Sequence, residues 1–244
     1  MNLIVDQGNS RYKLAIFDRS ELVTLYQPPD PFGLEDLKQW LSGQPVVHEC
    51  IISSVGDPDR EIQEFLQQQY GAIVLTKDLK LPFTMGYESP QTLGVDRIAL
   101  MSAANLHHPT TNALVIDAGS CITFDFLDAS GTYHGGTIAP GIRMRYLAMH
   151  RQTAGLPLRE PELPDSYIGV TTAQSMHVGV LLGMAYEIDA TIDRYREDFG
   201  DLTVILTGGD AHFLRDSIKN DIFAHSNFLL EGLNHLLEVN SSTF

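Results

Sequence analysis

LIVDQGNSRYKLAIFD, residues 3–18, is the stretch that decides the fold. Its apolar start leads into Asp6, a turn follows at residues 8–10, and an alternating apolar run begins beyond Lys13. Apolar strands on both sides of a glycine turn predict an antiparallel pair that is joined tightly. An ordinary hairpin, in which Asp6 and the glycine only form the turn, is the alternative interpretation.

The same plan returns at residues 114–128, LVIDAGSCITFDFLD. Asp117 takes the place of Asp6, and Gly119 takes the place of Gly8. One such hairpin is readily explained by turn chemistry. Two copies, each with a buried-looking strand that delivers an aspartate, indicate a duplicated half-molecule with a function placed between the halves.

The chemistry of both turns suits phosphate. Glycine turns let backbone N–H groups point into one concavity, which binds anions. A carboxylate at a strand end, such as that of Asp6, can hold Mg²⁺, which bridges phosphate oxygens and keeps several waters. Ser10 and Ser120 add hydroxyl donors, and Lys13 supplies a positive charge for a phosphate.

Composition limits the class of protein. The 244 residues allow one large or two modest domains, and the 43% hydrophobic content predicts a packed globular chain. The net charge is −15 and no basic stripe appears, so nucleic acid is not an expected partner. An acidic protein that handles anions must recruit metal ions or place its few Lys and Arg residues locally.

Cysteine usage and apolar runs indicate the compartment. Cys50 and Cys121 have no CxxC or histidine neighbour at ligand spacing, which argues against a zinc site and fits a reducing environment. Met1 leads directly into a strand and leaves no room for a signal peptide. The longest apolar run, residues 178–186, is too short to span a bilayer. The chain is therefore expected in the cytoplasm, without a membrane partner.

Strands alternate with helices along the chain, which predicts an α/β fold. In the first half, strands are expected at residues 22–26, 49–54 and 73–75, and helices at 34–41, 59–70 and 94–106. The polar segment 107–112 is the expected linker, which gives domains at residues 1–111 and 112–244. The second half adds a strand ending at Pro140, a proline-rich excursion at 151–166, an apolar helix at 171–199, a strand at 202–207 and a helix near 231–238.

Two further segments are candidates for chemistry. GVDRIAL, residues 94–100, follows a long irregular loop and opens a helix. Asp96 there is either a helix-start residue favoured by the helix dipole or a general base, with Arg97 beside it to clamp a carboxylate. TGGD, residues 207–210, follows an apolar strand at the place where α/β proteins bind ligands, although a plain turn explains it equally well.

Five motifs follow one another along nearly the whole chain. They are DQGNS with Lys13, then Tyr87 before residues 94–97, then DAGSCITFD, then GGTIAPG, then TGGDA. In this order they resemble the type III pantothenate kinases, members of the acetate and sugar kinase, heat-shock chaperone and actin superfamily. The resemblance implies two duplicated ribonuclease-H-like domains, as in actin-like ATPases, around a central cleft for ATP. It also implies ATP-dependent phosphorylation of pantothenate, the first step of coenzyme A synthesis.

The resemblance implies a nucleotide site built on two glycine turns. Its expected cations are Mg²⁺ near Asp6 and a monovalent cation, potassium or ammonium, at Asp117. The residues implied to contact ATP are Asp6, Gly8, Asn9, Ser10, Lys13, Ser120, Gly208 and Gly209.

The resemblance also implies a substrate pocket and a homodimer. Asp96 matches the catalytic base of the family. The residues implied to bind pantothenate are Tyr87, Gly94, Val95, Asp96, Arg97 and Thr172. In this family the threonine reaches the substrate from the partner subunit, which agrees with the apolar helix at 171–199 as a buried contact.

The sequence departs from the family pattern at three positions. Ser10 and Ser120 stand where threonine is usual, which keeps both hydroxyls, and Cys121 takes the place of an alanine. Two rival functions stay open at this point: a kinase of the same superfamily with another small hydroxylated substrate, and a non-catalytic accessory factor in transcription. The carboxylates of Asp6, Asp96 and Asp117 favour catalysis over the second, because a pure binding module would not need all three.

Overall fold

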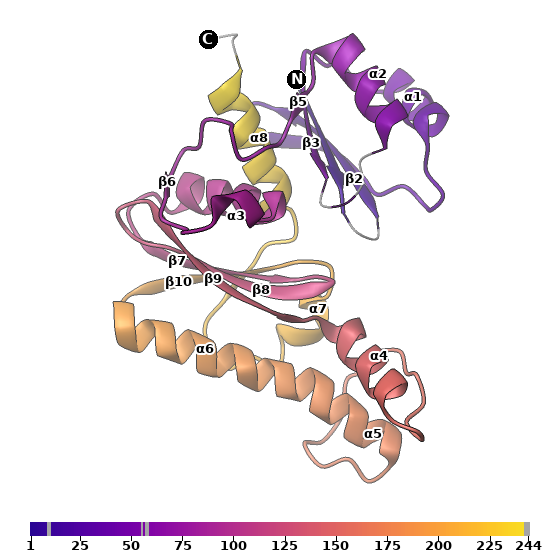
Figure 1. Cartoon of the computed structure of the whole chain (residues 1–244), viewed down its shortest axis with the longest axis vertical. Helices are drawn as coiled ribbons and strands as arrows, with labels where there is room; N and C mark the ends of the chain where they lie inside the picture. The colour runs from indigo at the N-terminus through magenta and orange to yellow at the C-terminus, as the bar shows by residue number, and fades with distance from the viewer. Residues whose placement is uncertain (9–10, 55, 57–58, 242–244) are drawn as a thin grey trace. The chain divides into compact units, whose positions relative to one another are not determined.

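The chain divides into two compact units, drawn in Figure 1. Unit 1 comprises Met1–His107 and Asn227–Phe244, and unit 2 comprises His108–Ser226. The computed structural model describes residues 1–8, 11–54, 56 and 59–241. No helix in these ranges is long and apolar enough to cross a membrane.

Unit 1 is built on a five-stranded sheet around the first hairpin. The strands are β1 (Asn2–Gln7), β2 (Tyr12–Asp18), β3 (Glu21–Tyr26), β4 (Glu49–Ser54) and β5 (Ile73–Val74), in the order β3-β2-β1-β4-β5. The central strand β1 runs antiparallel to β2 and parallel to β4. The hairpin and the strands predicted for this half are therefore confirmed.

Helices α1 (Leu34–Ser42) and α2 (Arg60–Tyr70) cover one face of this sheet. Leu37, Ile62 and Leu66 pack there against alternate residues of β1. The start and end of α2 follow from its sequence: the Asp59 carboxylate accepts hydrogen bonds from two backbone N–H groups of the first turn, and the helix ends at Gly71 with a φ of +60°. Both helices agree with the predicted ranges.

The last helix of the chain belongs to unit 1. α8 (Phe228–Asn240) packs along α3 (Val95–His107), and a Cβ atom at Gly232 would lie 1.9 Å from the Ala99 carbonyl oxygen, so the two helices approach as closely as glycine permits. His107 Nε2 lies 2.7 Å from Glu231 Oε2 across the same contact. The expected domain bounds, 1–111 and 112–244, differ from this division at the linker and in the assignment of α8.

Unit 2 repeats the strand plan of unit 1. The strands β7 (Asn112–Ala118), β8 (Cys121–Leu127), β9 (Thr132–Pro140), β10 (Leu202–Thr207) and β11 (Phe223–Ala224) follow in the order β11-β10-β7-β8-β9. The central strand β7 runs antiparallel to β8 and parallel to β10. The first strand of each unit is thus flanked by its hairpin partner and by the fourth strand, and the repeated hairpin is present in both units.

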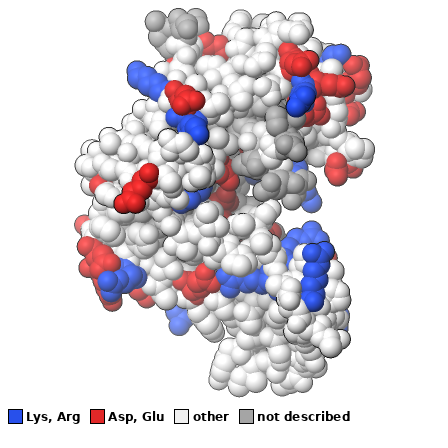
Figure 2. Space-filling view, in the orientation of Figure 1, with Lys and Arg blue, Asp and Glu red and all other residues white. Residues whose placement is uncertain are grey.

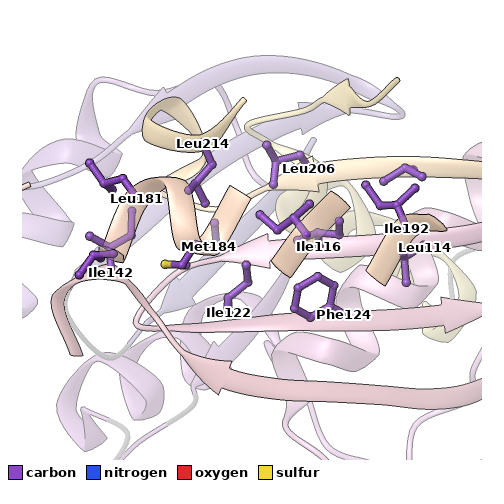
Figure 3. Packing of buried hydrophobic residues seen from close by; sticks show 14 of the residues in the cluster. Leu114, Ile116, Ile122, Phe124, Ile142, Leu181, Met184, Ile192, Leu206 and Leu214 are labelled. Carbon is purple, nitrogen blue, oxygen red and sulfur yellow. The ribbon is translucent and has the colours of Figure 1, made fainter. Parts of the chain in front are cut away.

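The predicted long helix of unit 2 is one nearly continuous element. It comprises α5 (Thr172–His177), a π-helical segment (Val178–Leu182) and α6 (Gly183–Phe199). Figure 3 shows Leu181, Met184 and Ile192 of this element in one buried cluster with Ile116 and Phe124 of the sheet. Its apolar residues therefore form the core of unit 2. Two helices that the sequence reading did not predict complete the unit: α4 (Ile142–Gln152) and α7 (Ala211–Leu214).

The irregular loop 76–91 of unit 1 contains little regular structure. It holds the two-residue strand β6 (Thr84–Met85) and leads into a 3-10 turn, Pro90–Thr92, directly before α3. Lys77 Nζ donates to the Gln91 carbonyl at 3.3 Å, and Asn105 of α3 donates to the Pro82 carbonyl at 3.1 Å. The loop is thus tied to α3, whose first turn carries the candidate base.

Candidate active site

Asp6 ends the central strand of unit 1 and is almost fully buried. The residues paired with it in register are Lys13 on β2 and Ser53 on β4. Burial raises the pKa of the Asp6 carboxyl to about 6; the positive charge of Lys13 and the Ser53 hydroxyl oppose this rise, and the charge of Asp96 adds to it. A buried carboxyl of this kind gains most from a nearby cation.

The first glycine turn follows Asp6 directly. The N–H of Gly8 donates to the Arg11 carbonyl at 3.1 Å, which closes the turn between β1 and β2. Asn9 and Ser10, the other two residues expected to contact phosphate, lie outside the described residues. The described part of the loop therefore places Asp6, Gly8 and Lys13 at one end of the hairpin.

The start of α3 gathers the residues expected at the substrate pocket. The N–H of Arg97 donates to Asp96 Oδ1 at 2.8 Å, and a Cβ atom at Gly94 would lie 2.4 Å from the same oxygen. Arg97 is 4% exposed, and its guanidinium carbon lies 5.6 Å from the centre of the Tyr87 ring, over its face. Val95 is the first residue of the helix. Asp96 is thus held by its own helix start, while Arg97 is held against an aromatic ring.

Asp96 and Asp6 lie close enough for their charges to interact. Asp6 lies at the end of β1 and Asp96 in the first turn of α3. These two carboxyls therefore lie in one neighbourhood, together with Lys13. Unit 1 thus holds the candidate base, the candidate Mg²⁺ residue and the candidate substrate residues of α3 and its preceding loop, whereas Thr172 belongs to unit 2.

In unit 2, Asp117 stands near the end of β7 where three glycine turns meet. The N–H of Gly119 donates to the Cys121 carbonyl at 2.9 Å, which makes the turn into β8 tight. Gly208 has a φ of +96°, and a Cβ atom on it would lie 2.4 Å from Asp117 Oδ1. The turn after β10 can therefore close on Asp117 only with glycine at position 208.

The third turn precedes α4 and packs on the Ser120 loop. A Cβ atom at Gly141 would lie 2.4 Å from the carbonyl oxygens of both Gly119 and Ser120. The turn is also held from the helix side, because Arg145 Nε donates to the Pro140 carbonyl at 2.8 Å and its guanidinium pairs with Glu187 at 2.6 Å. Nothing in the sequence indicated this contact, because packing between segments twenty residues apart leaves no local signal.

Charged side chains lie close to the turn after β10. Burial raises the pKa of the Asp210 carboxyl, while His212 and Arg143 lower it, so an arginine of α4 acts on the turn after β10. Ser120 and Gly209 are both exposed, and a Cβ atom at Gly209 would meet nothing within 4 Å. Open glycine backbone, an exposed hydroxyl and a nearby arginine are the elements from which phosphate sites are built.

A cation at Asp117 would find oxygen ligands. The Asp117 carboxylate lies beside the Ala118 carbonyl, as the Gly208 contacts with both show, and hard cations prefer such oxygens. Within the described ranges, no group of three or more His, Cys, Asp or Glu side chains is placed to hold a metal. Backbone, water or ligand oxygens would therefore have to complete the coordination of any cation here.

Sequence comparison identifies the family. A family model for type III pantothenate kinases matches residues 2–194. The chain belongs to the type III pantothenate kinase family. A type III pantothenate kinase of Flavobacterium johnsoniae is 44% identical and the match covers 96% of both chains. Another, of Christiangramia forsetii, is 41% identical over 99% of this chain and all of the relative.

Solved structures confirm the fold of this type III pantothenate kinase family member. A protein described as a Baf family transcriptional activator from Campylobacter jejuni matches with a TM-score of 0.62 at 23% identity, over 98% of both chains. A ROK family glucokinase from Streptomyces griseus, solved with glucose and AMPPNP, matches with a TM-score of 0.51 at 10% identity, also over 98% of both chains. At these identities the likeness shows the two-sheet, actin-like ATPase fold alone, as predicted.

Proposed function

We propose that this protein transfers the γ-phosphoryl group of ATP to the primary hydroxyl of pantothenate, giving 4'-phosphopantothenate and ADP. Membership of the family supports this activity, which opens coenzyme A synthesis. The observation that carries the assignment of roles is the shared neighbourhood of Asp96, Asp6 and Lys13, with Arg97 next to Asp96 in the same helix start and over the Tyr87 ring. We expect the reaction to take place in the cytoplasm.

We assign the nucleotide phosphates of ATP to both glycine turns. Ser120 and the turn at Gly208 and Gly209 would contact the nucleotide in unit 2, and Gly8, Asn9, Ser10 and Lys13 would contact the transferred phosphate in unit 1. Figure 2 shows Lys and Arg side chains gathered over α4, which carries three arginines and no acidic residue. Local positive charge on an acidic protein is what anion binding requires.

Asp96 is the base in this mechanism. Phosphoryl transfer needs little covalent chemistry from the protein, so positioning and charge neutralisation dominate. The hydroxyl oxygen of pantothenate forms the new bond to phosphorus, the bond from phosphorus to the oxygen bridging to ADP breaks, and Asp96 accepts the hydroxyl proton. Arg97 would bind a polar end of the substrate, and Tyr87, Gly94 and Val95 would line its pocket.

We assign Mg²⁺ to Asp6 and a monovalent cation, potassium or ammonium, to Asp117. The buried Asp6 carboxyl and the carboxylate–carbonyl pair at Asp117 suit hard cations. When bound, the cations neutralise charge on the phosphate oxygens. The protein side chains orient the phosphates and exclude other charges from the site.

We further propose a homodimer through the surface around α5. Large apolar side chains are exposed there, including Tyr167 at 73% and Val170 at 82%, and the face seen in Figure 2 is nearly uncharged over α5. Contiguous apolar surface of this kind marks protein interfaces. Thr172, exposed at the start of α5, lies two residues from Val170 and would reach the substrate of the partner subunit.

The activity is tested by coupled ADP release with ATP, Mg²⁺ and potassium, with and without pantothenate. ADP release that depends on pantothenate is the expected result. A panel of sugars, acids and other small alcohols separates pantothenate from substrates of other kinases in the superfamily. Release that is equal with and without pantothenate would contradict the proposal.

The dimer is tested by sedimentation of Val170→Asp. We expect this variant to be monomeric and inactive, whereas Val46→Asp, which charges a 73% exposed valine of unit 1, should remain dimeric. Mixing Asp96→Asn with Thr172→Ala adds a second test, because a hybrid dimer would hold one intact site. Activity regained on mixing supports the contribution of Thr172 across the interface, and no gain contradicts it.

A further inference from the structure

The acidic strand end of each unit faces a buried hydroxyl on the neighbouring parallel strand. Asp6 of β1 pairs in register with Ser53 of β4, and Asp117 of β7 pairs in register with Thr207 of β10. Ser53 is 0% exposed and Thr207 is 3% exposed. Partners in register project from the same face of a sheet. The duplication has therefore placed a hydroxyl beside a carboxyl twice.

The Ser53 side chain is the buried polar group next to Asp6 on β4. The strand register places its hydroxyl beside the Asp6 carboxyl, and the hydroxyl lowers the pKa of that carboxyl against the larger effect of burial. Yet Ser53 Oγ has no hydrogen-bond partner among the residues that the structure describes. A fully buried hydroxyl without a partner is rare in native proteins, and such a group often has a role that a bound ligand or water completes.

A structural role does not explain Ser53. The residues that precede it along β4, Cys50, Ile51 and Ile52, are buried and apolar. An alanine at position 53 would therefore fit the strand without leaving an unpaired polar atom. Lys13 acts on Asp6 from the other neighbouring strand. Asp6 thus lies between a cation on β2 and a hydroxyl on β4.

We propose that Ser53 is a positioning residue whose hydroxyl holds the Asp6 carboxylate in the orientation that receives Mg²⁺. The inference rests on the proposed function, since it takes Asp6 as the Mg²⁺ residue of the kinase. Groups that orient a metal-binding side chain change metal affinity or activity by roughly 10- to 100-fold when they are removed. Ser53 would act through Asp6 and would not touch the substrate.

The test compares Ser53→Ala with Ser102→Ala. Ser102, on α3, is also 0% exposed and its Oγ also has no partner within the described part of the chain, so it is a matched control. In Ser53→Ala, the Mg²⁺ concentration for half-maximal activity should rise roughly 10- to 100-fold, with the KM for pantothenate unchanged. Ser102→Ala should keep the Mg²⁺ dependence of the wild type. Ser53→Cys, close to serine in size but a poor donor, should behave as Ser53→Ala.

Calorimetry supplies a readout that does not depend on turnover. Binding of a non-hydrolysable ATP analogue with Mg²⁺ should weaken in Ser53→Ala, while binding of the analogue without Mg²⁺ should not change. Ser53→Ala should also unfold no more easily than the wild type when both are free of ligand. Wild-type Mg²⁺ dependence in Ser53→Ala, or an equal shift in Ser102→Ala, would overturn the inference. A wild-type chain without pantothenate-dependent ADP release would overturn the proposed function instead, and calorimetry would still decide the role of Ser53.

Discussion

Replacing Asp6 by asparagine is expected to stabilise ligand-free unit 1 at neutral pH while it abolishes activity. Burial raises the pKa of the folded Asp6 from its ordinary 3.8 to about 6. The folded chain therefore binds this proton more tightly than the unfolded chain. The stabilisation that results is complete below the pKa of Asp6 in the unfolded chain. It is lost as the pH rises through the pKa of Asp6 in the folded chain.

The size of the effect follows from the difference between the two pKa values. A shift of about two pH units corresponds to about 3 kcal/mol of unfolding free energy, and roughly 2 kcal/mol of it is lost between pH 4 and pH 8. Asparagine cannot ionise, so the unfolding free energy of the variant does not fall in this way as the pH rises. The unfolding free energy of Asp6→Asn, relative to the wild type, should therefore increase by roughly 2 kcal/mol over that range.

Urea unfolding at several pH values, without nucleotide or Mg²⁺, measures this difference. Trp40 is the single tryptophan of the sequence and lies in α1 of unit 1, stacked on Tyr26 with ring centres 5.5 Å apart. Its fluorescence therefore reports the unfolding of the unit that holds Asp6. A difference between variant and wild type that does not change with pH would refute the assignment of a costly buried charge at Asp6.

Three further outcomes are expected. Asp96→Asn should fold and keep its stability but lose roughly 10²- to 10⁴-fold in kcat, and near-native kcat in the ADP assay would remove Asp96 from the role of base. Gly208→Ala should destabilise unit 2 by about 1–3 kcal/mol, because its φ is +96° and the added Cβ would contact Asp117 Oδ1, whereas Gly209→Ala in open space should be neutral in thermal unfolding. Asp117→Asn should lose activation by potassium, and an unchanged potassium titration would contradict the cation site.

Local patterns were sufficient to predict the hairpin at the centre of each sheet. Each hairpin combines apolar alternation with a glycine turn, and both signals lie within sixteen residues of sequence. The helix expected at 94–106 and found at Val95–His107, with Asp96 in its first turn, was equally local. These features depend on neighbours in the chain, so they were predictable from the sequence.

Contacts between distant segments account for what the sequence did not indicate. α4, IRMRYLAMHRQ, buries only Ile142 and Tyr146, so its sequence shows no apolar stripe. The apolar face of α8 shows that it must pack on something, but nothing in the sequence specifies α3 as its partner. Ser53 faces Asp6 only because β4 pairs with β1 in one register out of several. Pairing between strands nearly fifty residues apart has no signature in either segment.

The return of the chain to unit 1 after unit 2 has a consequence for synthesis on the ribosome. The surface of α3 that α8 covers stays uncovered until residues 228–240 emerge. Unit 1 is therefore begun before unit 2 but completed after it, and unit 2, whose residues are contiguous, can close first. A stop codon shortly before residue 227 would damage the amino-terminal unit rather than the part of the gene product next to the lesion.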